Sequence, residues 1–275
     1  MKKTLTALTI VLAIAALAWG CRPPRGGSGG TRARQSTVEQ VLERGELRVG
    51  FSKFRRWAML DKEGNYVGFE IDVARRLAAD MGVELVLVPT QWKGIIGGLL
   101  SGEFDVIIGG MGITPERNKK VNFTIPYDYS GLGIVAHEDN ADGFDSLEDF
   151  NKEGVVIVTR QGSTAEQAAR RLFPRATLRT FAQGEQVRQE LLSGRVHAQI
   201  AGVPEPRDSA NEYDKLFVPV EGQLTKEPIG FAVQKGDVDT LNYFNNWIRV
   251  RWAEGWLQER KQYWFETEEW ADQVE

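Results

Sequence analysis

The chain has 275 residues, with 34 Lys and Arg, 38 Asp and Glu, 2 His and a single Cys, and a formal net charge of −4. Its acidic and basic residues are interspersed, so it lacks the concentrated basic face of a nucleic-acid binder. One cysteine cannot build a disulfide framework or a cysteine-based zinc site. His137 and His197 stand alone in the sequence, and such histidines are more often structural than catalytic. We therefore expect no nucleic-acid partner, no metal and no cofactor.

The first 21 residues are typical of an export signal. Lys2 and Lys3 precede a mostly apolar run over residues 5–19, which ends at Gly20 and Cys21. The run is shorter than the roughly 18 residues that a transmembrane helix needs, and its layout is that of a signal peptide. Because Cys21 is the only cysteine, we predict that it receives lipid after cleavage and anchors the protein at a membrane. The alternative is an ordinary secreted protein with one free thiol.

Residues 22–36 are predicted to form a flexible tether. They are rich in Gly, Pro, Ser and Arg and have no apolar periodicity, so they cannot pack into a core. The folded part is predicted to begin at Thr37. The residues from there to the end are enough for one large domain or for two lobes with cores of their own.

Short β-rich runs alternate with segments of helical periodicity along the rest of the chain. The predicted strands are residues 47–51, 84–89, 104–109, 155–159, 177–181, 196–201 and 229–234. The predicted helices are residues 69–81, 93–101, 164–172, 185–193 and a long segment from 237 to about 264. This alternation predicts an α/β fold with largely parallel sheets. Trp247, Trp252 and Trp256 lie at near-helical spacing and are predicted to pack in a core.

One segment of the sequence returns about ninety residues later. LLSGEFDVIIGG at residues 99–110 and LLSGRVHAQIAG at residues 191–202 are identical at six of twelve positions. Each reads as a helix end, a glycine and a strand, so the same unit is built twice. The repeat predicts two similar α/β lobes, and a chance recurrence of a common helix-end pattern is the alternative.

Two glycine-containing corners follow predicted strands: GGMGITPER at residues 109–117 and QGST at residues 161–164. In open α/β sheets, ligands bind beyond the carboxyl ends of strands. Glycines let a ligand approach the backbone, hydroxyls and amides donate to an anion, and the planar fork of Arg117 suits a carboxylate. The corners therefore predict a carboxylate clamp. Neither has the pattern of a phosphate loop or a dinucleotide fingerprint.

Four motifs together carry a family resemblance: GFEIDVA at residues 68–74, FDVI at 104–107, GMGITPER at 110–117 and VNFTIPY at 121–127. Between about Val38 and Phe265 the chain resembles the extracellular solute-binding proteins of polar amino-acid ABC transporters. The resemblance implies an α/β fold of the two-lobed periplasmic binding protein kind (type II), with two crossover strands near residues 133–137 and 228–233. Lobe 1 would comprise residues 37–136 and 229–275, and lobe 2 residues 137–228.

The resemblance also implies a function. Such a protein captures an amino acid or a related small carboxylate between its lobes and delivers it to an ABC permease, without chemistry on the ligand. We therefore expect a monomeric, membrane-anchored lipoprotein of the periplasm or another extracytoplasmic space, not an enzyme.

Site residues follow from the resemblance position by position. Arg117 would pair with the α-carboxylate of the ligand, and Trp92 and an aromatic from Phe54 or Trp57 would lie against its side chain. The alternative for Trp92 is a core tryptophan. The residues expected to help Arg117 are Gly110, Gly112, Thr114, Ser163 and Thr164.

The sequence departs from the family pattern at Gly202. In amino-acid binders that resemble this chain, the strand ending there usually finishes with an aspartate that holds the α-ammonium group, a bond that contributes roughly 1.5–3 kcal/mol. Glu205 can substitute if the loop at residues 202–206 turns inward; otherwise it is a solvated loop carboxylate. Position 202 therefore lacks the usual partner for the ammonium group of an α-amino acid.

Basic residues near the first strand bear on the ligand's charge. Ser52 and Lys53 occupy a region where binders of cationic ligands tend to carry acid, and Arg55 and Arg56 follow. This composition favours a neutral or anionic ligand over lysine or arginine.

The chain also resembles periplasmic cyclohexadienyl dehydratases, which share the fold and act on prephenate-like carboxylates. In those enzymes a glutamate just past the same strand is the general acid, and Glu205 falls at about that position. General acid catalysis needs a carboxyl group that is protonated near neutral pH. Such an enzyme and a ligand-sensing receptor are the alternatives to transport. The predicted lipid tether favours transport over both.

Overall fold

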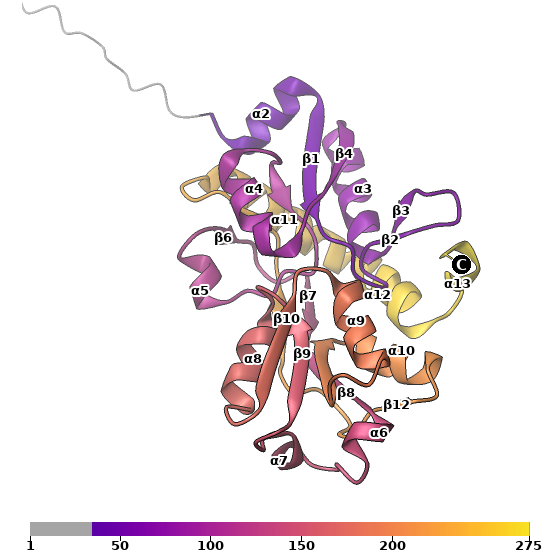
Figure 1. The fold of residues 1–275 in the computed structure, drawn as a ribbon. Coiled ribbons are helices and arrows are strands. Elements are labelled where there is room, and N and C mark those ends of the chain that lie inside the picture. The colour runs from indigo at the N-terminus through magenta and orange to yellow at the C-terminus, as the bar shows by residue number, and fades with distance from the viewer. Residues whose placement is uncertain (1–34, 275) are drawn as a thin grey trace, which may run out of the picture. The chain divides into compact units, whose positions relative to one another are not determined.

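The computed structural model describes residues 35–274 (Figure 1). They contain two five-stranded sheets and two small two-stranded sheets, covered by helices. The predicted signal peptide, Cys21 and most of the tether lie outside the described residues. Within the described part, no helix is both long enough and apolar enough to cross a membrane.

The first lobe, in the upper half of Figure 1, is built on a sheet with strand order β4-β1-β5-β14-β6. β1 pairs in parallel with β4 and β5, whereas β14 runs antiparallel to β5 and β6. The strands are β1 (Glu46–Phe51), β4 (Glu84–Pro89), β5 (Val106–Ile107), β6 (Asn122–Phe123) and β14 (Ala232–Val233), with a hairpin of β2 (Met59–Leu60) and β3 (Tyr66–Val67). The helices are α2 (Thr37–Arg44), α3 (Phe69–Met81), η1 (Trp92–Gly94), α4 (Ile95–Ser101), α5 (Pro115–Asn118), α11 (Val238–Ala253), α12 (Trp256–Glu266) and α13 (Ala271–Val274).

The second lobe, in the lower half of Figure 1, repeats this plan with strand order β10-β9-β11-β8-β12. β9 pairs in parallel with β10 and β11, and β8 runs antiparallel to β11 and β12. The strands are β8 (Leu132–His137), β9 (Val156–Arg160), β10 (Thr177–Phe181), β11 (Ala198–Gly202) and β12 (Leu216–Phe217). The helices are α6 (Glu138–Ala141), α7 (Leu147–Phe150), α8 (Thr164–Leu172), α9 (Gly184–Leu192) and α10 (Glu205–Glu212).

The internal repeat occupies equivalent places in the two lobes. Its first copy runs from the end of α4 through β5, and its second from the end of α9 through β11, the third strand of each sheet. Gly102 and Gly194 provide the left-handed turn after each helix, with φ of 79° and 67°, a conformation that favours glycine. The prediction of two similar lobes is confirmed, but the sheets are mixed rather than largely parallel. β8 and β14 run antiparallel because each follows a chain connection that enters from the other lobe.

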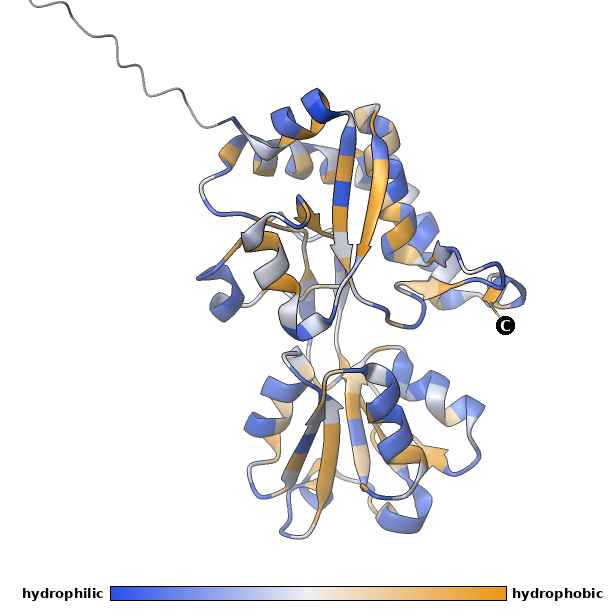
Figure 2. Ribbon diagram, turned by 45° about the horizontal axis from the view of Figure 1, so that its top comes forward, coloured by the Kyte–Doolittle hydropathy of each residue, from blue (hydrophilic) through white to orange (hydrophobic). Residues whose placement is uncertain are grey.

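Each lobe has its own apolar core. Apolar residues are concentrated in the strands, and hydrophilic residues cover much of the outward helix surface (Figure 2). Phe69, Leu77 and Trp247 are buried in the first lobe, and Phe150 and Ile200 in the second. The core positions of Trp247, Trp252 and Trp256 agree with the sequence prediction, although the last two are only partly buried. Burial of these faces supplies the main driving force for folding each lobe.

The long C-terminal helix expected from residue 237 is two helices. α11 ends at Ala253 and α12 begins at Trp256. Gly255 between them has a φ of 78°, and a left-handed residue at this point ends a helix. Apolar periodicity continues across the break, and for this reason the pattern predicted one helix.

Two short strands connect the lobes. β7 (Asp128–Ser130) pairs antiparallel with β13 (Glu227–Ile229). Residues 133–137, expected as the first crossover, instead lie in β8, a fully buried strand of the second sheet. The first connection therefore precedes that segment, and residues 132–136 pack in lobe 2 rather than lobe 1. The second expected crossover overlaps the end of β13 and all of β14.

Candidate ligand-binding site

A cavity of about 760 Å³ lies between the lobes, within the usual range of small-molecule sites. Its walls come from the loops that follow β1, β4 and β5 in one lobe and β9 and β11 in the other. These loops lie beyond the carboxyl ends of the strands, where open α/β sheets bind ligands. The predicted site residues that line it are Phe54, Trp57, Trp92, Gly110, Gly112, Arg117, Ser163, Thr164 and Glu205.

Arg117 is the buried cation of the first corner. It lies on α5, whose N-cap is Thr114; the Thr114 hydroxyl accepts a hydrogen bond from the Arg117 amide at 3.2 Å. Thr114 therefore positions Arg117 and does not itself line the cavity. The Arg117 guanidinium donates to the carbonyl oxygens of Gly112 at 2.7 Å and Gly162 at 3.2 Å. A buried cation whose hydrogen-bond acceptors are neutral attracts an anion strongly.

Burial lowers the pKa of Arg117 to about 10, and the negative charge of Glu227 opposes this shift. The group stays protonated at neutral pH. Its hydrogen bond to Gly162 also joins the lobes, since α5 and the β9–α8 corner come from opposite sides of the cleft.

Glycine at position 112 leaves room beside this guanidinium. A Cβ atom there would lie 3.0 Å from Oε2 of Glu227 and 3.6 Å from Nη1 of Arg117. The side chains of both charged residues therefore converge on the face of the backbone that glycine leaves bare. A larger residue would close this part of the cavity.

The second corner forms the start of α8. Ser163 is its N-cap, with its hydroxyl accepting from the Glu166 amide at 3.2 Å and donating to the Arg160 carbonyl at 2.6 Å. The Thr164 hydroxyl donates to Oε2 of Glu227 at 2.8 Å. Both hydroxyls thus have partners within the protein.

Trp92 bridges the lobes and lies near two arginines. Its Nε1 donates to the Gly162 carbonyl at 3.2 Å. The guanidinium carbons of Arg117 and Arg160 lie 5.5 Å and 5.6 Å from the centroid of a Trp92 ring, within cation–π range. Trp92 is therefore a half-buried residue of the cleft wall, and its other contacts are with the core cluster around Ile95.

Phe54 and Trp57 have different positions. Trp57 is only 3% exposed and packs against Phe69 and Phe265. Phe54 is less buried and reaches across the cleft: its ring lies 3.2 Å from where a Cβ atom of Gly202 would be. Phe54 is thus the aromatic residue that occupies the space beside the end of β11.

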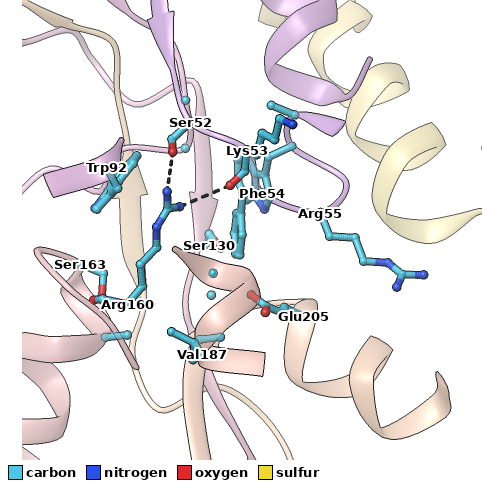
Figure 3. Close-up of a pocket in the computed structure, with 18 of the residues that line it drawn as sticks. Ser52, Lys53, Phe54, Arg55, Trp92, Ser130, Arg160, Ser163, Val187 and Glu205 are labelled. Carbon is cyan, nitrogen blue, oxygen red and sulfur yellow. Dashed lines mark hydrogen bonds between the residues drawn. The ribbon is translucent and has the colours of Figure 1, made fainter. Parts of the chain in front are cut away.

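Arg160 is a site residue that the sequence did not predict. It ends β9, and its guanidinium donates to the Ser52 hydroxyl and to the Lys53 carbonyl across the cleft (Figure 3). Its Nε is buried without a hydrogen-bond partner in residues 35–274. Burial lowers its pKa to about 10, against the attraction of Glu205. The available signal was an arginine at the end of a predicted strand, directly before a glycine corner.

Glu205 turns into the cleft from the first turn of α10 (Figure 3). Gln199 Nε2 donates to its Oε1 at 3.0 Å. Burial raises the pKa of Glu205, while the Gln199 hydrogen bond and the charges of Arg188 and Arg160 oppose the rise. The solvated-loop alternative does not fit this location.

Within residues 35–274, no group of three or more His, Cys, Asp or Glu residues is placed to hold a metal ion.

Ion pairs at the rim also join the lobes. The buried Arg56 guanidinium donates to both oxygens of Asp208 on α10, at 2.7 Å and 2.9 Å, and also pairs with Glu268. Arg55 pairs with Glu212, and its side chain points away from the labelled cleft residues (Figure 3). Arg56 is therefore committed to the protein and is not available to a ligand.

We expect Asp208→Asn to weaken ligand binding by about tenfold or more. Removing one partner of a buried ion pair costs about 3–5 kcal/mol when the remaining charge is uncompensated, and Glu268 will offset part of this for Arg56. The lost ion pair destabilises mainly the closed form, in which the two lobes are in contact, because Arg56 and Asp208 belong to different lobes. Isothermal titration calorimetry measures the affinity, and small-angle X-ray scattering of the ligand-free protein should show a larger radius of gyration. The exposed Asp214→Asn serves as a control, and equal behaviour of the two variants would contradict this role for Asp208.

The chain belongs to the bacterial extracellular solute-binding proteins, family 3, whose family model matches residues 47–267. Cyclohexadienyl dehydratase of Pseudomonas aeruginosa is 27% identical, over 87% of this chain and 90% of that enzyme. Among solved structures, an ancestral amino acid-binding protein, described as a precursor of cyclohexadienyl dehydratase, is 40% identical with a TM-score of 0.76. A binding component of an ABC transporter from Wolinella succinogenes, solved with lysine, is 38% identical with a TM-score of 0.78. Each of these structures covers 84% of this chain and is itself fully covered.

These comparisons confirm the family and the two-lobed α/β fold that the motifs predicted. They include binding proteins and an enzyme on the same fold, so the fold alone does not decide between these functions.

Proposed function

We propose that this protein is the substrate-binding component of an ABC importer and that it captures an amino acid or a related small carboxylate between its lobes. The observation that carries the proposal is Arg117: a buried guanidinium in an interlobe cavity, whose hydrogen bonds within residues 35–274 go to two carbonyl oxygens. A ligand carboxylate would give this cation a charged partner. The partner protein would be the permease in the membrane, and the binding protein would act as a monomer.

The charge of the cavity favours a ligand without net positive charge. Arg55 is already paired with Glu212, and the remaining cationic lining residues outnumber the acidic ones: they are Lys53, Arg117, Arg160 and Arg188, against Glu185, Glu205 and Glu227. The relative solved with lysine shows that the family accepts cationic ligands. For this chain we propose a neutral or acidic ligand, because a cation would add to the unbalanced positive charge.

Thermal unfolding against a ligand panel tests this function. The protein is stripped of ligand by unfolding and refolding, and then heated with each of the twenty amino acids, with dicarboxylates and with prephenate. A ligand at about a hundred times its dissociation constant adds about 2.7 kcal/mol of stability. We expect a shift with at least one neutral or acidic amino acid and none with lysine or arginine. If the panel produces no shift, the proposal fails.

The second candidate function is a dehydratase acting on prephenate or arogenate. It is favoured by Glu205, whose pKa is raised by burial, as a general acid requires, and by the Pseudomonas relative. Incubating the protein with prephenate and following its conversion decides between the two. Turnover would establish the enzyme, and recovery of unchanged prephenate would leave binding as the function.

A sensory receptor is the third candidate. A receptor would bind the same ligand without delivering it to a permease.

We also propose that residues 1–21 are a lipoprotein signal peptide and that Cys21 carries the lipid anchor. Support comes from the sequence pattern and from the extracytoplasmic character of the family. Expressed in a bacterial host, the wild-type protein should sediment with membranes, and Cys21→Ala should be found in the soluble exported fraction. The same distribution for both proteins would disprove the anchor.

A further inference from the structure

Glu227 places a carboxylate in the ligand cavity. It is the first residue of the connecting strand β13, and its half-buried side chain lines the cavity. Its Oε2 accepts from the Thr164 hydroxyl at 2.8 Å, and its Oε1 accepts from the Thr225 hydroxyl at 3.0 Å. Both donors are neutral, and no lysine or arginine of the described chain forms an ion pair with Glu227. Its negative charge is therefore only partly compensated.

Glu227 and Arg117 both approach the bare face of Gly112. The point where a Cβ atom would stand is 3.0 Å from Oε2 of Glu227 and 3.6 Å from Nη1 of Arg117. The two charges attract each other but do not form a direct ion pair. The cavity thus presents a cation and an anion next to each other, each with free capacity for a ligand of opposite charge.

An α-amino acid carries the matching charges on one carbon atom. A ligand whose carboxylate binds Arg117 must place its ammonium group within a few ångströms of that contact. An ammonium group held in a closed cavity needs an acidic partner, because an unpaired buried charge costs several kcal/mol. Glu227 is a carboxylate within reach of this position, because its Oε2 approaches the same face of Gly112 as the Arg117 guanidinium.

The position where an aspartate was expected is not available for this role. Gly202 has no side chain, and the Phe54 ring lies 3.2 Å from the point where its Cβ atom would be. The ring fills the space that an aspartate side chain would enter.

Glu205, which the sequence indicated as the alternative acceptor for the ammonium group, is in a different electrostatic environment. Gln199 already donates to it at 3.0 Å. Its charge is also balanced by Arg188 and Arg160, whereas the cation that interacts with Glu227 is Arg117. Glu205 therefore belongs to a second charge pair with Arg160, separate from the carboxylate clamp.

We propose that Glu227 binds the α-ammonium group of the ligand while Arg117 binds its α-carboxylate. This inference rests on the proposed binding function and narrows it: the ligand is an α-amino acid and not its deaminated counterpart. Glu227 would then serve as the ammonium acceptor that position 202 lacks. Because Glu227 lies on a connecting strand, one end of the ligand would contact the segment that joins the lobes.

Matched pairs of compounds that differ only in the α-ammonium group test the proposal. The pairs are L-glutamate with glutarate, L-glutamine with glutaramate, L-leucine with 4-methylpentanoate and L-phenylalanine with 3-phenylpropanoate. Isothermal titration calorimetry with the full chain gives the ratio of the two affinities for each pair. In the wild type we expect the amino acid to bind about 10- to 100-fold more tightly, as a charge-assisted hydrogen bond implies.

Glu227→Gln should reduce this ratio by about tenfold or more. The glutamine carbonyl can accept from one of the two threonine hydroxyls, and its amide can donate to the oxygen of the other, so the side chain stays hydrogen-bonded while the charge is lost. Glu227→Asp, which keeps the charge, should retain part of the preference and guards against a general loss of folding. Glu205 also lines the cavity, so Glu205→Gln should change the two affinities of a pair together and leave their ratio at its wild-type value. The control Glu221→Gln on the exposed surface should change neither affinity.

Each outcome decides the matter. An unchanged ratio in Glu227→Gln, or a ratio that falls only in Glu205→Gln, overturns the assignment to Glu227. If the wild type binds only the deaminated compounds, this inference fails while carboxylate binding stands. If the wild type binds no compound of these pairs, the amino acid that stabilises it most in the thermal panel is compared with its deaminated counterpart in the same way. If no compound of that panel stabilises it, both the inference and the proposed function fail.

Discussion

Arg117→Ala should reduce ligand affinity by about two orders of magnitude or more. Truncating one member of a buried hydrogen-bonded charge pair costs about 2–5 kcal/mol or more, and the ligand carboxylate would be left without its main partner. The fold should persist, because the lost hydrogen bonds go to two carbonyl oxygens and because removing a buried cation relieves its desolvation. Calorimetric titration measures the affinity, and thermal unfolding without ligand measures the stability.

Two further variants sharpen this test. Arg117→Lys keeps the charge but loses the planar fork that matches a carboxylate, so its affinity should lie between those of the wild type and Arg117→Ala. Arg170→Ala removes an exposed arginine on α8 and should bind like the wild type. Wild-type affinity in Arg117→Ala would remove this residue from the site.

Raising the pH from 5 to 9 should destabilise the protein through Glu70. This carboxyl group is fully buried on α3 and accepts hydrogen bonds from the Tyr127 hydroxyl, 2.7 Å away, and from the Gly110 amide. Burial raises its pKa from 4.5 to about 8. Between these values the folded state holds a proton that the unfolded state releases. Stability therefore falls as the pH rises through this window and levels off above the folded pKa.

The expected loss is on the order of a few kcal/mol, because each pKa unit corresponds to about 1.4 kcal/mol. Urea unfolding at pH 5 and pH 9 measures the change in the free energy of unfolding. Glu70→Gln remains neutral throughout and should lose much less over the same range, while the exposed Glu63→Gln should lose as much as the wild type. If Glu70→Gln loses as much stability between pH 5 and pH 9 as the wild type does, Glu70 is not the titrating group.

Local sequence patterns predicted the regular elements well. The helices at residues 69–81 and 164–172 and the strands at 84–89 and 177–181 have the predicted bounds. Each spans several periods of its pattern, and glycine marks the end of the first helix at Gly82, where φ is 69°. Such signals are local, so the sequence carries them directly.

The connections between the lobes could not be read in the same way. β7 and β13 have only three residues each, too few for any periodicity. β8 is buried on both faces, so its sequence is a nearly continuous apolar run. Such a run predicts a buried strand but does not show which sheet the strand joins. The first crossover was for this reason expected several residues too late.

The site was predictable where a corner motif holds the residue and not where a distant contact does. Arg117 and the glycines around it follow a strand directly, and the structure places them in the cavity. Arg160 meets Ser52 at a separation of 108 residues, and Arg56 meets Asp208 at 152. Glu227 reaches the clamp only because β13 pairs with β7. No spacing rule within one segment could indicate these contacts.

The most direct test of the account is to recover the ligand after it has bound. Equilibrium dialysis of the purified protein with the amino acid that stabilises it most, followed by mass spectrometry of the released compound, measures both stoichiometry and chemical identity. We predict one molecule bound per chain, released unchanged, and no measurable retention by Arg117→Ala. Release of a chemically altered compound, or equal retention by Arg117→Ala, would contradict the account of this protein as a binding protein with a carboxylate clamp at Arg117.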